Sequence, residues 1–261
     1  MNDATAEAIA ALRERLAPAR RLLVFTGAGV STAAGIPDFR SPGGLWQRLR
    51  PIEFGEFMRS AKARDETWRR KFELDEAFGR PQPTAAHRAI AAAVPRLAAV
   101  VTQNIDGLHS ASGVPAELLV ELHGNGNYAS CLNCGERHEL ADMRRRFQAE
   151  GHAPQCACGG WIKPATISFG QAMPQRAMQR AEQATRAADL VLVLGSSLQV
   201  YPAAGFPELA CELGTELVIL NREPTPLDAH ASLVIHDEID HVLPPALGTG
   251  DPVQQPRGVI H

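Results

Sequence analysis

The sequence predicts an α/β protein with a doubly wound, Rossmann-like parallel sheet and a second, smaller lobe. Short apolar runs of strand length recur along the chain, and helical patterns separate several of them. Continuous apolar strands that alternate with helices are typical of a parallel sheet covered on both faces. Two segments interrupt the alternation: residues 42–81 are aromatic-rich and highly charged, and residues 125–163 carry four clustered cysteines. We expect these two insertions to form the small domain, and residues 1–41, 82–124 and 164–261 to form the large one.

Size and charge restrict the class of protein. The chain has 261 residues, of which 45% are hydrophobic and 21% charged, and its formal net charge is -3. These values exclude a disordered tail and a disulfide-stapled miniprotein. The near-neutral balance gives no electrostatic reason to expect a nucleic-acid partner.

No membrane or export segment is expected from the pattern. The longest uncharged stretch, residues 190–207, reaches spanning length but contains several small polar residues and two prolines. We interpret it as a strand, a loop and a helix start. The first residues include Asp3 and Glu7 and lack the apolar core of a signal peptide. We therefore expect a cytoplasmic protein without a membrane partner.

The positions of apolar residues predict the elements in order. Ile9, Leu12 and Leu16 share one stripe and predict an amphipathic helix that ends near Pro18. Further helices are expected, the first with Thr84 as its N-cap, over residues 84–93, 175–188 and 203–213. Strands are expected over residues 22–25, 97–101, 118–122, 190–194, 217–220 and 233–235. The Pro- and Gly-rich tail after Leu243 is expected to fray.

A glycine-rich loop follows the first expected strand. Residues 26–31 read Thr-Gly-Ala-Gly-Val-Ser. Glycines at this place let the backbone turn tightly and approach a pyrophosphate, whose charge is met by the N–H groups of the next helix start. The spacing departs from GxGxxG, because Ser31 and Thr32 occupy the region of the third glycine. A dinucleotide site and a plain strand-to-helix turn explain this loop equally well.

Small and polar residues follow two later strands. These residues are Gln103, Asn104, Asp106, Gly195, Ser196 and Ser197. They come at the strand ends where open α/β sheets bind ligands. Asn and Asp before Gly107 are also ordinary turn formers, and a serine after a strand also serves as a helix N-cap, so both interpretations stay open.

Four of the five cysteines are clustered. The pairs are Cys131-x-x-Cys134 and Cys156-x-Cys158, whereas Cys211 stands alone in an apolar segment, where we expect a small buried hydrophobic residue. In a reducing compartment, clustered cysteines are more often metal ligands than disulfides. Four thiolates leave no open coordination position, so we expect a structural zinc ion. Since the second pair is one residue shorter than C-x-x-C, an iron–sulfur site or an unoccupied cluster is the alternative.

The motifs together resemble those of one family. The stretch GAGVSTAAGIPDFR, residues 27–40, resembles the signature of the sirtuins, which are NAD-dependent protein lysine deacylases. Further sirtuin-like motifs follow in the family's order: TQNIDGLH at 102–109, LHG at 122–124, the cysteine quartet, GSSL at 195–198, PAA at 202–204 and LVILN at 217–221. The resemblance covers roughly residues 20–245.

The resemblance implies roles for particular residues. The catalytic residues would be His123, Asn104 and Asp106, with His123 as a neutral base that accepts a proton from a ribose hydroxyl. Gln103 would contact the ribose, Asn104 would position a ribose hydroxyl and a water, and Asp106 would accept from the nicotinamide carboxamide. The NAD contacts would be Gly27, Ala28, Gly29, Ser31, Thr32, Asp38, Phe39, Arg40, Gln103, Asn104, Ile105, Asp106, Gly195, Ser196, Ser197, Asn221, Arg222 and Ile239. His87, His109 and His138 receive no role.

The resemblance also implies an acyl-lysine site. Ile167, Phe169 and Gly170 would bind the protein substrate as an extended peptide between the lobes, and Phe39 would line the acyl-lysine tunnel and guard the reactive ribose carbon. Core packing alone also explains these apolar residues. Ser168 stands where many relatives have Phe, and Gln171 where they have Glu, which puts the acyl-chain preference in doubt.

A second departure from the family concerns acidic acyl groups. The segment from Trp68 to Phe72 lacks a clear Tyr-x-x-Arg pair of the kind that holds them. An unpaired carboxylate in an apolar tunnel would cost several kcal/mol, so we expect acetyl or a somewhat longer neutral group.

These observations predict an enzyme that removes an acyl group from protein lysine while it cleaves NAD. The resemblance implies that nicotinamide and O-acyl-ADP-ribose are released, and that NAD is a consumed co-substrate. One alternative is an ADP-ribosyltransferase or NAD glycohydrolase that uses the same pocket. A non-catalytic NAD-sensing interaction module is the other.

Overall fold

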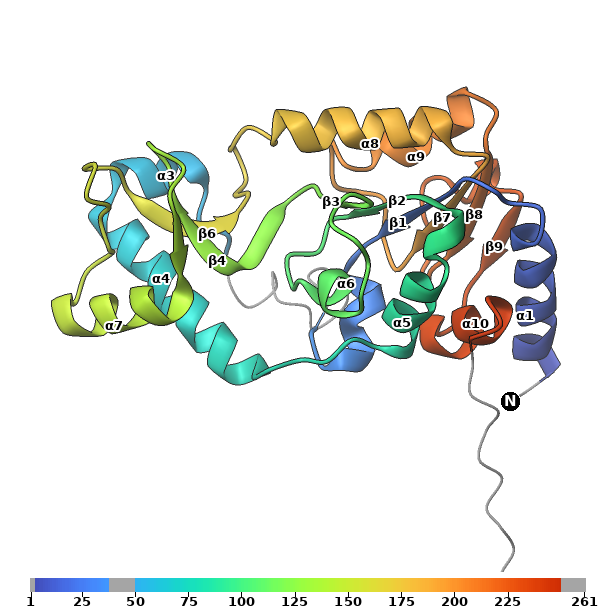
Figure 1. Cartoon of the computed structure of the whole chain (residues 1–261), viewed down its shortest axis with the longest axis horizontal. Coiled ribbons are helices and arrows are strands. Elements are labelled where there is room, and N and C mark those ends of the chain that lie inside the picture. The colour runs from blue at the N-terminus through green and yellow to red at the C-terminus, as the bar shows by residue number, and fades with distance from the viewer. Residues whose placement is uncertain (1–2, 38–49, 250–261) are drawn as a thin grey trace, which may run out of the picture.

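A parallel six-stranded sheet organises the larger part of the chain (Figure 1). The computed structural model describes residues 3–37 and 50–249. The strands run in the order β3-β2-β1-β7-β8-β9. Their bounds are β1 (Leu22–Thr26), β2 (Leu97–Thr102), β3 (Leu119–Glu121), β7 (Leu190–Leu194), β8 (Glu216–Leu220) and β9 (Leu233–Ile235). Because the chain turns outward in opposite directions from β1, the predicted doubly wound sheet is confirmed, with its switch point between β1 and β7.

Helices cover both faces of this sheet. One face carries α1 (Asp3–Leu16), α5 (Ala85–Ala92) and α10 (Ile239–Ala246), and the other carries α8 (Gln175–Ala187) and α9 (Gly205–Glu212) (Figure 1). Alternate residues of β1 serve the two cores: Leu22 and Val24 pack toward the first layer, and Leu23 and Phe25 toward the second. This double burial explains why the strands are continuously apolar.

The predicted element positions agree with the structure within a few residues. Thr84 caps α5, because its Oγ1 accepts a hydrogen bond from the backbone N–H of His87 at 3.3 Å. Ile9, Leu12 and Leu16 form the buried stripe of α1. Short helices fill some connections: η2 (Val94–Arg96), α6 (Leu108–Ala111) and η3 (Asp228–His230).

The expected fraying after Leu243 is wrong for the described residues. Helix α10 continues through Pro244 and Pro245 to Ala246. Leu243 and Ala246 are buried against the layer of α1 and α5, and this burial holds the segment despite two missing N–H donors. Cys211, expected to be buried, is only partly buried on α9, where it packs against the core.

A second, antiparallel sheet organises the smaller lobe. Its strands run in the order β5-β4-β6, with bounds β4 (Gly124–Cys131), β5 (Arg137–Glu139) and β6 (Ile162–Thr166). No strand was expected here from the sequence, since β4 reads GNGNYASC and lacks an apolar pattern. Strand β6 crosses the domain boundary expected after residue 163.

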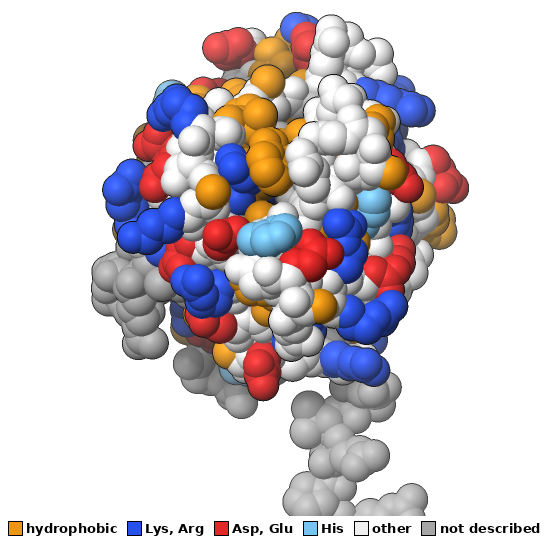
Figure 2. All heavy atoms as spheres, turned by 90° about the vertical axis from the view of Figure 1, so that its left-hand side faces the viewer, with side chains coloured by type: hydrophobic (Ala, Val, Ile, Leu, Met, Phe, Trp, Pro, Cys, Tyr) orange, Lys and Arg blue, Asp and Glu red, His pale blue; other side chains and the backbone are white. Residues whose placement is uncertain are grey.

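Three helices surround the small sheet: α3 (Phe54–Arg59), α4 (Ala61–Phe78) and α7 (Leu140–Glu150). Trp68 and Phe72 of α4 are buried against Ile162, and the indole N–H of Trp68 donates to Ile162 O at 3.2 Å. Figure 2 shows Lys and Arg side chains interspersed with Asp and Glu over this end of the molecule. Within residues 3–37 and 50–249, no helix is long and apolar enough to cross a membrane.

Candidate active site and zinc centre

The loops that follow β1, β2 and β7 are bonded to one another at the carboxyl edge of the large sheet. The backbone N–H of Gly27 donates to Leu194 O at 3.0 Å, and that of Gln103 donates to Thr26 O at 3.0 Å. These bonds extend the strand ladders into the loops. Ligands of open α/β sheets bind at this edge, so the loops are the first candidates for a site.

Gly27 and Gly29 lie against the backbone of Gly195. A Cβ at Gly27 would lie 2.6 Å from Gly195 O, and a Cβ at Gly29 would lie 2.6 Å from Gly195 Cα. The N–H of Gly29 donates to Gly195 O at 2.9 Å. Glycine is therefore required here by the approach of two loops, in addition to the tight turn and the approach of a pyrophosphate expected from the sequence. The loop continues as a 3₁₀ helix, η1 (Ala28–Ala34), which contains Thr32.

Ser31, Asn104 and Asp106 form one hydrogen-bonded group. The hydroxyl of Ser31 donates to Asp106 Oδ2 at 2.7 Å, and Nδ2 of Asn104 donates to Gly27 O at 3.0 Å and to Ser31 Oγ at 3.2 Å. The second carboxylate oxygen of Asp106 accepts from Leu108 N at 2.9 Å. The carboxylate and amide are thus held in fixed orientations before any ligand arrives.

Gln103 connects this group to the loop after β7. Its Nε2 donates to Ser196 Oγ at 2.7 Å, and Ser196 is buried. Ser197 follows at a half-buried position, and Ile105 is half-buried in the loop between Asn104 and Asp106. The structure therefore brings together the predicted NAD-contacting residues of three loops.

His123 lies two residues after the end of β3 and contacts the loop after β2. Its Nδ1 donates to the backbone carbonyl of Gln103 at 3.0 Å, since a carbonyl only accepts. The donor assignment places the lone pair of the neutral ring on Nε2. Burial lowers the pKa of His123 below its ordinary value, and the bond to Gln103 raises it in part. The imidazole is therefore neutral at pH 7 and has one free acceptor nitrogen.

The candidate acyl-lysine residues follow β6, and the first of them, Ile167, is hydrogen-bonded to His123. The N–H of Ile167 donates to the backbone carbonyl of His123 at 2.8 Å. Phe169 is 46% exposed, and its carbonyl accepts from Phe54 N of α3 at 2.9 Å. Gly170 follows with a φ of 77°, which favours glycine.

The two departures from the family pattern in this segment contact each other. The side chain of Gln171 accepts from Ser168 N at 3.1 Å, and the N–H of Gln171 donates to Ser168 O at 3.0 Å. A glutamine therefore closes this turn without adding a charge beside Phe169 and Gly170.

Three further predicted NAD contacts, Asn221, Arg222 and Ile239, follow β8. The side chain of Asn221 donates to Glu223 O at 2.6 Å, and Arg222 forms an exposed ion pair with Glu238 at 3.4 Å. Ile239 begins α10 and is 7% exposed, so most of its surface packs in the core. Asp38, Phe39 and Arg40 lie outside the described residues.

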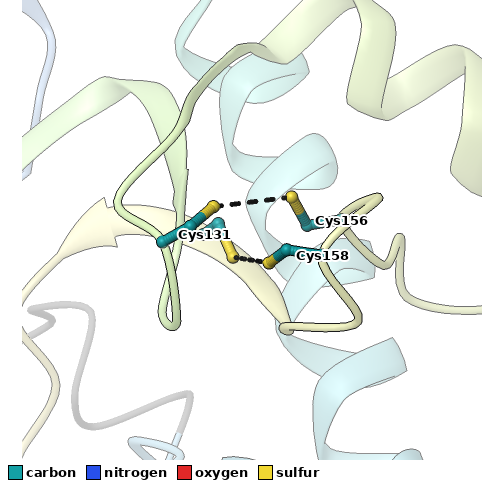
Figure 3. A group of neighbouring side chains, drawn as sticks. Cys131, Cys156 and Cys158 are labelled. Atoms are coloured by element: carbon teal, nitrogen blue, oxygen red, sulfur yellow. Dashed lines mark hydrogen bonds between the residues drawn. The ribbon is translucent and has the colours of Figure 1, made fainter.

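The four clustered cysteines converge in the small lobe (Figure 3). The sulfurs of Cys131 and Cys158 are 3.5 Å apart, and those of Cys134 and Cys156 are 3.8 Å apart. Disulfide sulfurs would be about 2.0 Å apart. Sulfurs bound to one tetrahedral zinc ion at about 2.3 Å lie about 3.8 Å from each other, so the cluster fits structural zinc. The N–H of Gly160 and the side chain of Asn133 lower the pKa of the Cys158 thiol to about 6, whereas burial and the side chain of Glu136 raise that of Cys156 to about 12.

Comparison with known proteins places these features in a family. The family model described as the Sir2 family matches residues 27–202, which include the glycine loop, His123 and all four clustered cysteines. The chain belongs to the Sir2 family. The sequence resemblance to the sirtuins is thereby confirmed.

Two relatives of this chain match over most of the length of both proteins. The chain is 51% identical over 240 residues to an NAD-dependent protein deacetylase of Rhodopseudomonas palustris, with 91% of this chain and 95% of the relative covered. It is also 51% identical over 240 residues to NAD-dependent protein deacetylase 1 of Bradyrhizobium diazoefficiens, which covers 91% and 94%. A Sir2 structure with a p53 peptide and NAD+ matches with a TM-score of 0.80 and 32% identity over 90% of this chain and 95% of that chain. Sir2Tm bound to a propionylated peptide matches with a TM-score of 0.81 and 31% identity over 93% and 99%.

Three consecutive basic residues of α4, Arg69 to Lys71, form ion pairs with acidic residues of the same helix. Arg69 and Arg70 both pair with Glu66, the second at 2.7 Å, and Lys71 pairs with Asp75 at 2.5 Å. The hydrogen bond from Arg70 is the largest cause of the lowered pKa of Glu66. These cations are therefore already paired within their own helix.

A histidine pair that received no role from the sequence, His87 and His109, is buried behind the candidate site. The rings of His87 and His109 are 4.7 Å apart, and His109 Nε2 lies 2.9 Å from Thr26 Oγ1, which donates to Thr102 Oγ1 at 2.8 Å. Burial, with a smaller contribution from His87, lowers the pKa of His109 to about 3. The pair connects the ends of β1 and β2 and stays neutral. The spacing of residues along one helix could not have predicted this pair, because His87 lies on α5 and His109 lies on α6.

Three polar residues beside the candidate site received no role from the sequence: Glu121 at the end of β3 in the large sheet, and Asn125 and Asn127 on β4 of the small lobe. Glu121 is half-buried, and burial is the largest cause of its raised pKa. Only the sequence HGNGN after the predicted catalytic histidine could have drawn attention to the two asparagines.

Proposed function

We propose that this chain is an NAD-dependent protein lysine deacylase that removes acetyl or another neutral acyl group from lysine. The position of His123 carries the proposal. Its ring donates to Gln103 in the loop after β2, and its backbone carbonyl accepts from Ile167 in the segment after β6. One residue therefore connects the loop assigned to NAD with the segment assigned to acyl-lysine.

The residues at the carboxyl edge fit NAD. Gly27 and Gly29 keep side chains out of the space between the loops, and Ser31, Gln103 and Ser196 present hydroxyl and amide groups there. When bound, NAD supplies the ribose carbon that loses nicotinamide and receives the acyl oxygen. Asn221 and Arg222 would hold the adenosine ribose, and Ile239 would flank the adenine.

His123 would act as the general base at Nε2. Its Nδ1 proton is committed to Gln103, so only Nε2 accepts a proton from a ribose hydroxyl. Base catalysis of this kind is typically worth about 10²- to 10⁴-fold in rate. Asp106 would accept from the nicotinamide carboxamide, with its carboxylate oriented by Ser31 and Leu108.

The substrate would bind as an extended peptide along the segment from Ile167 to Gly170, between the lobes. An apolar lining suits the methylene stem of a lysine whose charge acylation has removed. The pairing of Arg69, Arg70 and Lys71 within α4 supports a preference for neutral acyl groups, because these cations already have partners.

The zinc ion would be structural in this enzyme. Cys131, Cys134, Cys156 and Cys158 fill a tetrahedral shell and leave no position for water or substrate. Trp68 and Phe72 pack against the same lobe, so the metal and the helical insertion stabilise one unit. We accordingly keep residues 42–81 and 125–163 as the proposed small domain.

A product assay tests the proposed function. Peptides with acetyl-, propionyl-, butyryl- or succinyl-lysine are incubated with the protein, with and without NAD, and followed by mass. We expect NAD-dependent acyl loss from the neutral series and much slower loss from the succinyl peptide. Release of ADP-ribose without acyl loss would instead indicate a glycohydrolase or transferase.

A further inference from the structure

We infer that Asn125 and Asn127, at the start of β4, are positioning residues that hold the loop of Asp106 in its nicotinamide-binding form. The inference deepens the proposed function, since it rests on the assignment of Asp106 to the nicotinamide carboxamide. Both asparagines belong to the strand that also carries the zinc ligand Cys131. They act on the nucleotide site from the opposite lobe.

The contacts form a continuous clamp. Nδ2 of Asn127 donates to the backbone carbonyl of Asp106 at 3.1 Å. Its backbone N–H donates to Asn125 Oδ1 at 2.8 Å, and Asn125 Nδ2 donates to Glu121 Oε1 at 2.8 Å. Between them, the N–H of Gly126 donates to Ile105 O at 2.7 Å.

The chemistry of the partners fixes both amide orientations. A carboxylate accepts and a backbone N–H donates, so the side chain of Asn125 can satisfy both neighbours in one orientation only. A carbonyl accepts, so Nδ2 of Asn127 must face Asp106. An aspartate at either position has the same shape but lacks the donor.

The loop of Asp106 packs closely against the start of β4. A Cβ at Gly107 would lie 2.2 Å from Asn127 Nδ2, and a Cβ at Gly126 would lie 2.9 Å from Ile105 O. Gly107 also has a φ of 74°. The backbones of β4 and of the Asp106 loop are thus in direct contact, and the Asn127 amide lies over Gly107.

The side chain and the backbone of Asp106 are held by different partners. Ser31 and Leu108 hold the carboxylate oxygens, whereas Asn127 holds the carbonyl. Burial raises the pKa of Glu121, and the charge of Asp106 also raises it. Loss of the Asn127 donor would release the carbonyl of Asp106 and leave the loop joined to β4 through the bond from Gly126 to Ile105. Every group proposed to touch NAD would stay in the chain.

The test uses N127D, with Q183E on the exposed face of α8 as the matched amide-to-carboxylate control. The net worth of one hydrogen bond predicts a roughly 3- to 10-fold weaker Kd for NAD, measured calorimetrically, in N127D. The inhibition constant of nicotinamide should rise by a similar factor, with KM for the acyl peptide, zinc content and Tm unchanged. Q183E should match the wild type in every measurement.

Two results would overturn the clamp. One is a Kd for NAD in N127D within twofold of the wild-type value. The other is a weakened Kd accompanied by an equal loss of peptide affinity or by a lower Tm, which indicates general unfolding. A second variant, N125D, must raise the Kd for NAD in the same way, because it removes the hydrogen-bond donor to Glu121. NAD binding is measured without peptide, so a failure of deacylation in the wild type would contradict the proposed function and leave the clamp test intact.

Discussion

The Nδ1 of His123 donates to the backbone carbonyl of Gln103 at 3.0 Å, and this single bond selects the tautomer of the candidate catalytic ring. Because Gln103 in turn donates to Ser196 at 2.7 Å, the ring orientation depends on the loops after both β2 and β7. The proposed proton acceptor and the loops proposed to bind NAD are therefore arranged as one unit.

The rate of deacylation should depend on pH through His123. Burial lowers the pKa of His123 from 6.5, so the neutral, active form persists below neutrality. We expect kcat/KM to be flat above pH 7 and to decline on the acid side with a midpoint below 6.5. The pH profile of kcat/KM under subsaturating peptide checks this, and a midpoint at or above pH 7 would contradict the neutral-base assignment.

The approach of two loops predicts opposite effects for two glycine-to-alanine changes. G29A places a methyl group 2.6 Å from Gly195 Cα, and such overpacking costs about 1–3 kcal/mol of unfolding free energy. Gly205 is the first residue of α9, and nothing lies within 4 Å of a Cβ built there. G205A should therefore leave the unfolding free energy unchanged or raise it by about 0.5–1 kcal/mol. Urea unfolding of both variants measures the difference, and equal stabilities would refute the contact.

Acid should destabilise the fold through the buried His109. Its pKa is about 3 in the folded chain and about 6.5 when unfolded, so the unfolded state binds more protons between these values. The stability contribution is complete above pH 6.5 and is lost as the pH falls toward 3. H109Q keeps a donor for Thr26 and cannot titrate, so its unfolding free energy should fall less between pH 6.5 and 4. The same change at exposed His241 serves as the control and should retain the wild-type slope.

Zinc should be lost when one ligand of the cluster is removed. We expect C134S to contain far less than one zinc per chain and to lose near-UV signal from Trp68, which is buried beside the cluster. C211S changes a cysteine outside the cluster and should keep its zinc. Metal analysis of both folded proteins measures this, and zinc-free wild-type protein of full stability would rule out a structural role.

The large sheet was predictable because its strands are buried on both faces. Residues 190–194 are all apolar and buried, and the predicted strand has the observed bounds. Thr84 gave a correct helix start for the same local reason, since a cap signal is contained within four residues. Local patterns therefore determine these elements.

The small sheet and the contacts between loops could not be predicted from local pattern. Strand β4 reads GNGNYASC and has no apolar alternation, although it is the central strand of its sheet, and the buried side chains of this lobe include cysteines and Trp68. The contact of Gly29 with Gly195 and the bond between Asn127 and Asp106 join residues far apart in sequence. Only the fold brings such pairs together.

The stoichiometry of products in one reaction tests the central claim most directly. Nicotinamide and deacylated peptide are quantified together from an acetyl-lysine peptide and NAD, with wild-type protein and with H123A. We expect one nicotinamide per lysine released by the wild type, and no deacylated peptide from H123A although it still binds NAD. Nicotinamide release without acyl loss in the wild type, or undiminished deacylation by H123A, would contradict the assignment of His123 as the base of an NAD-dependent deacylase.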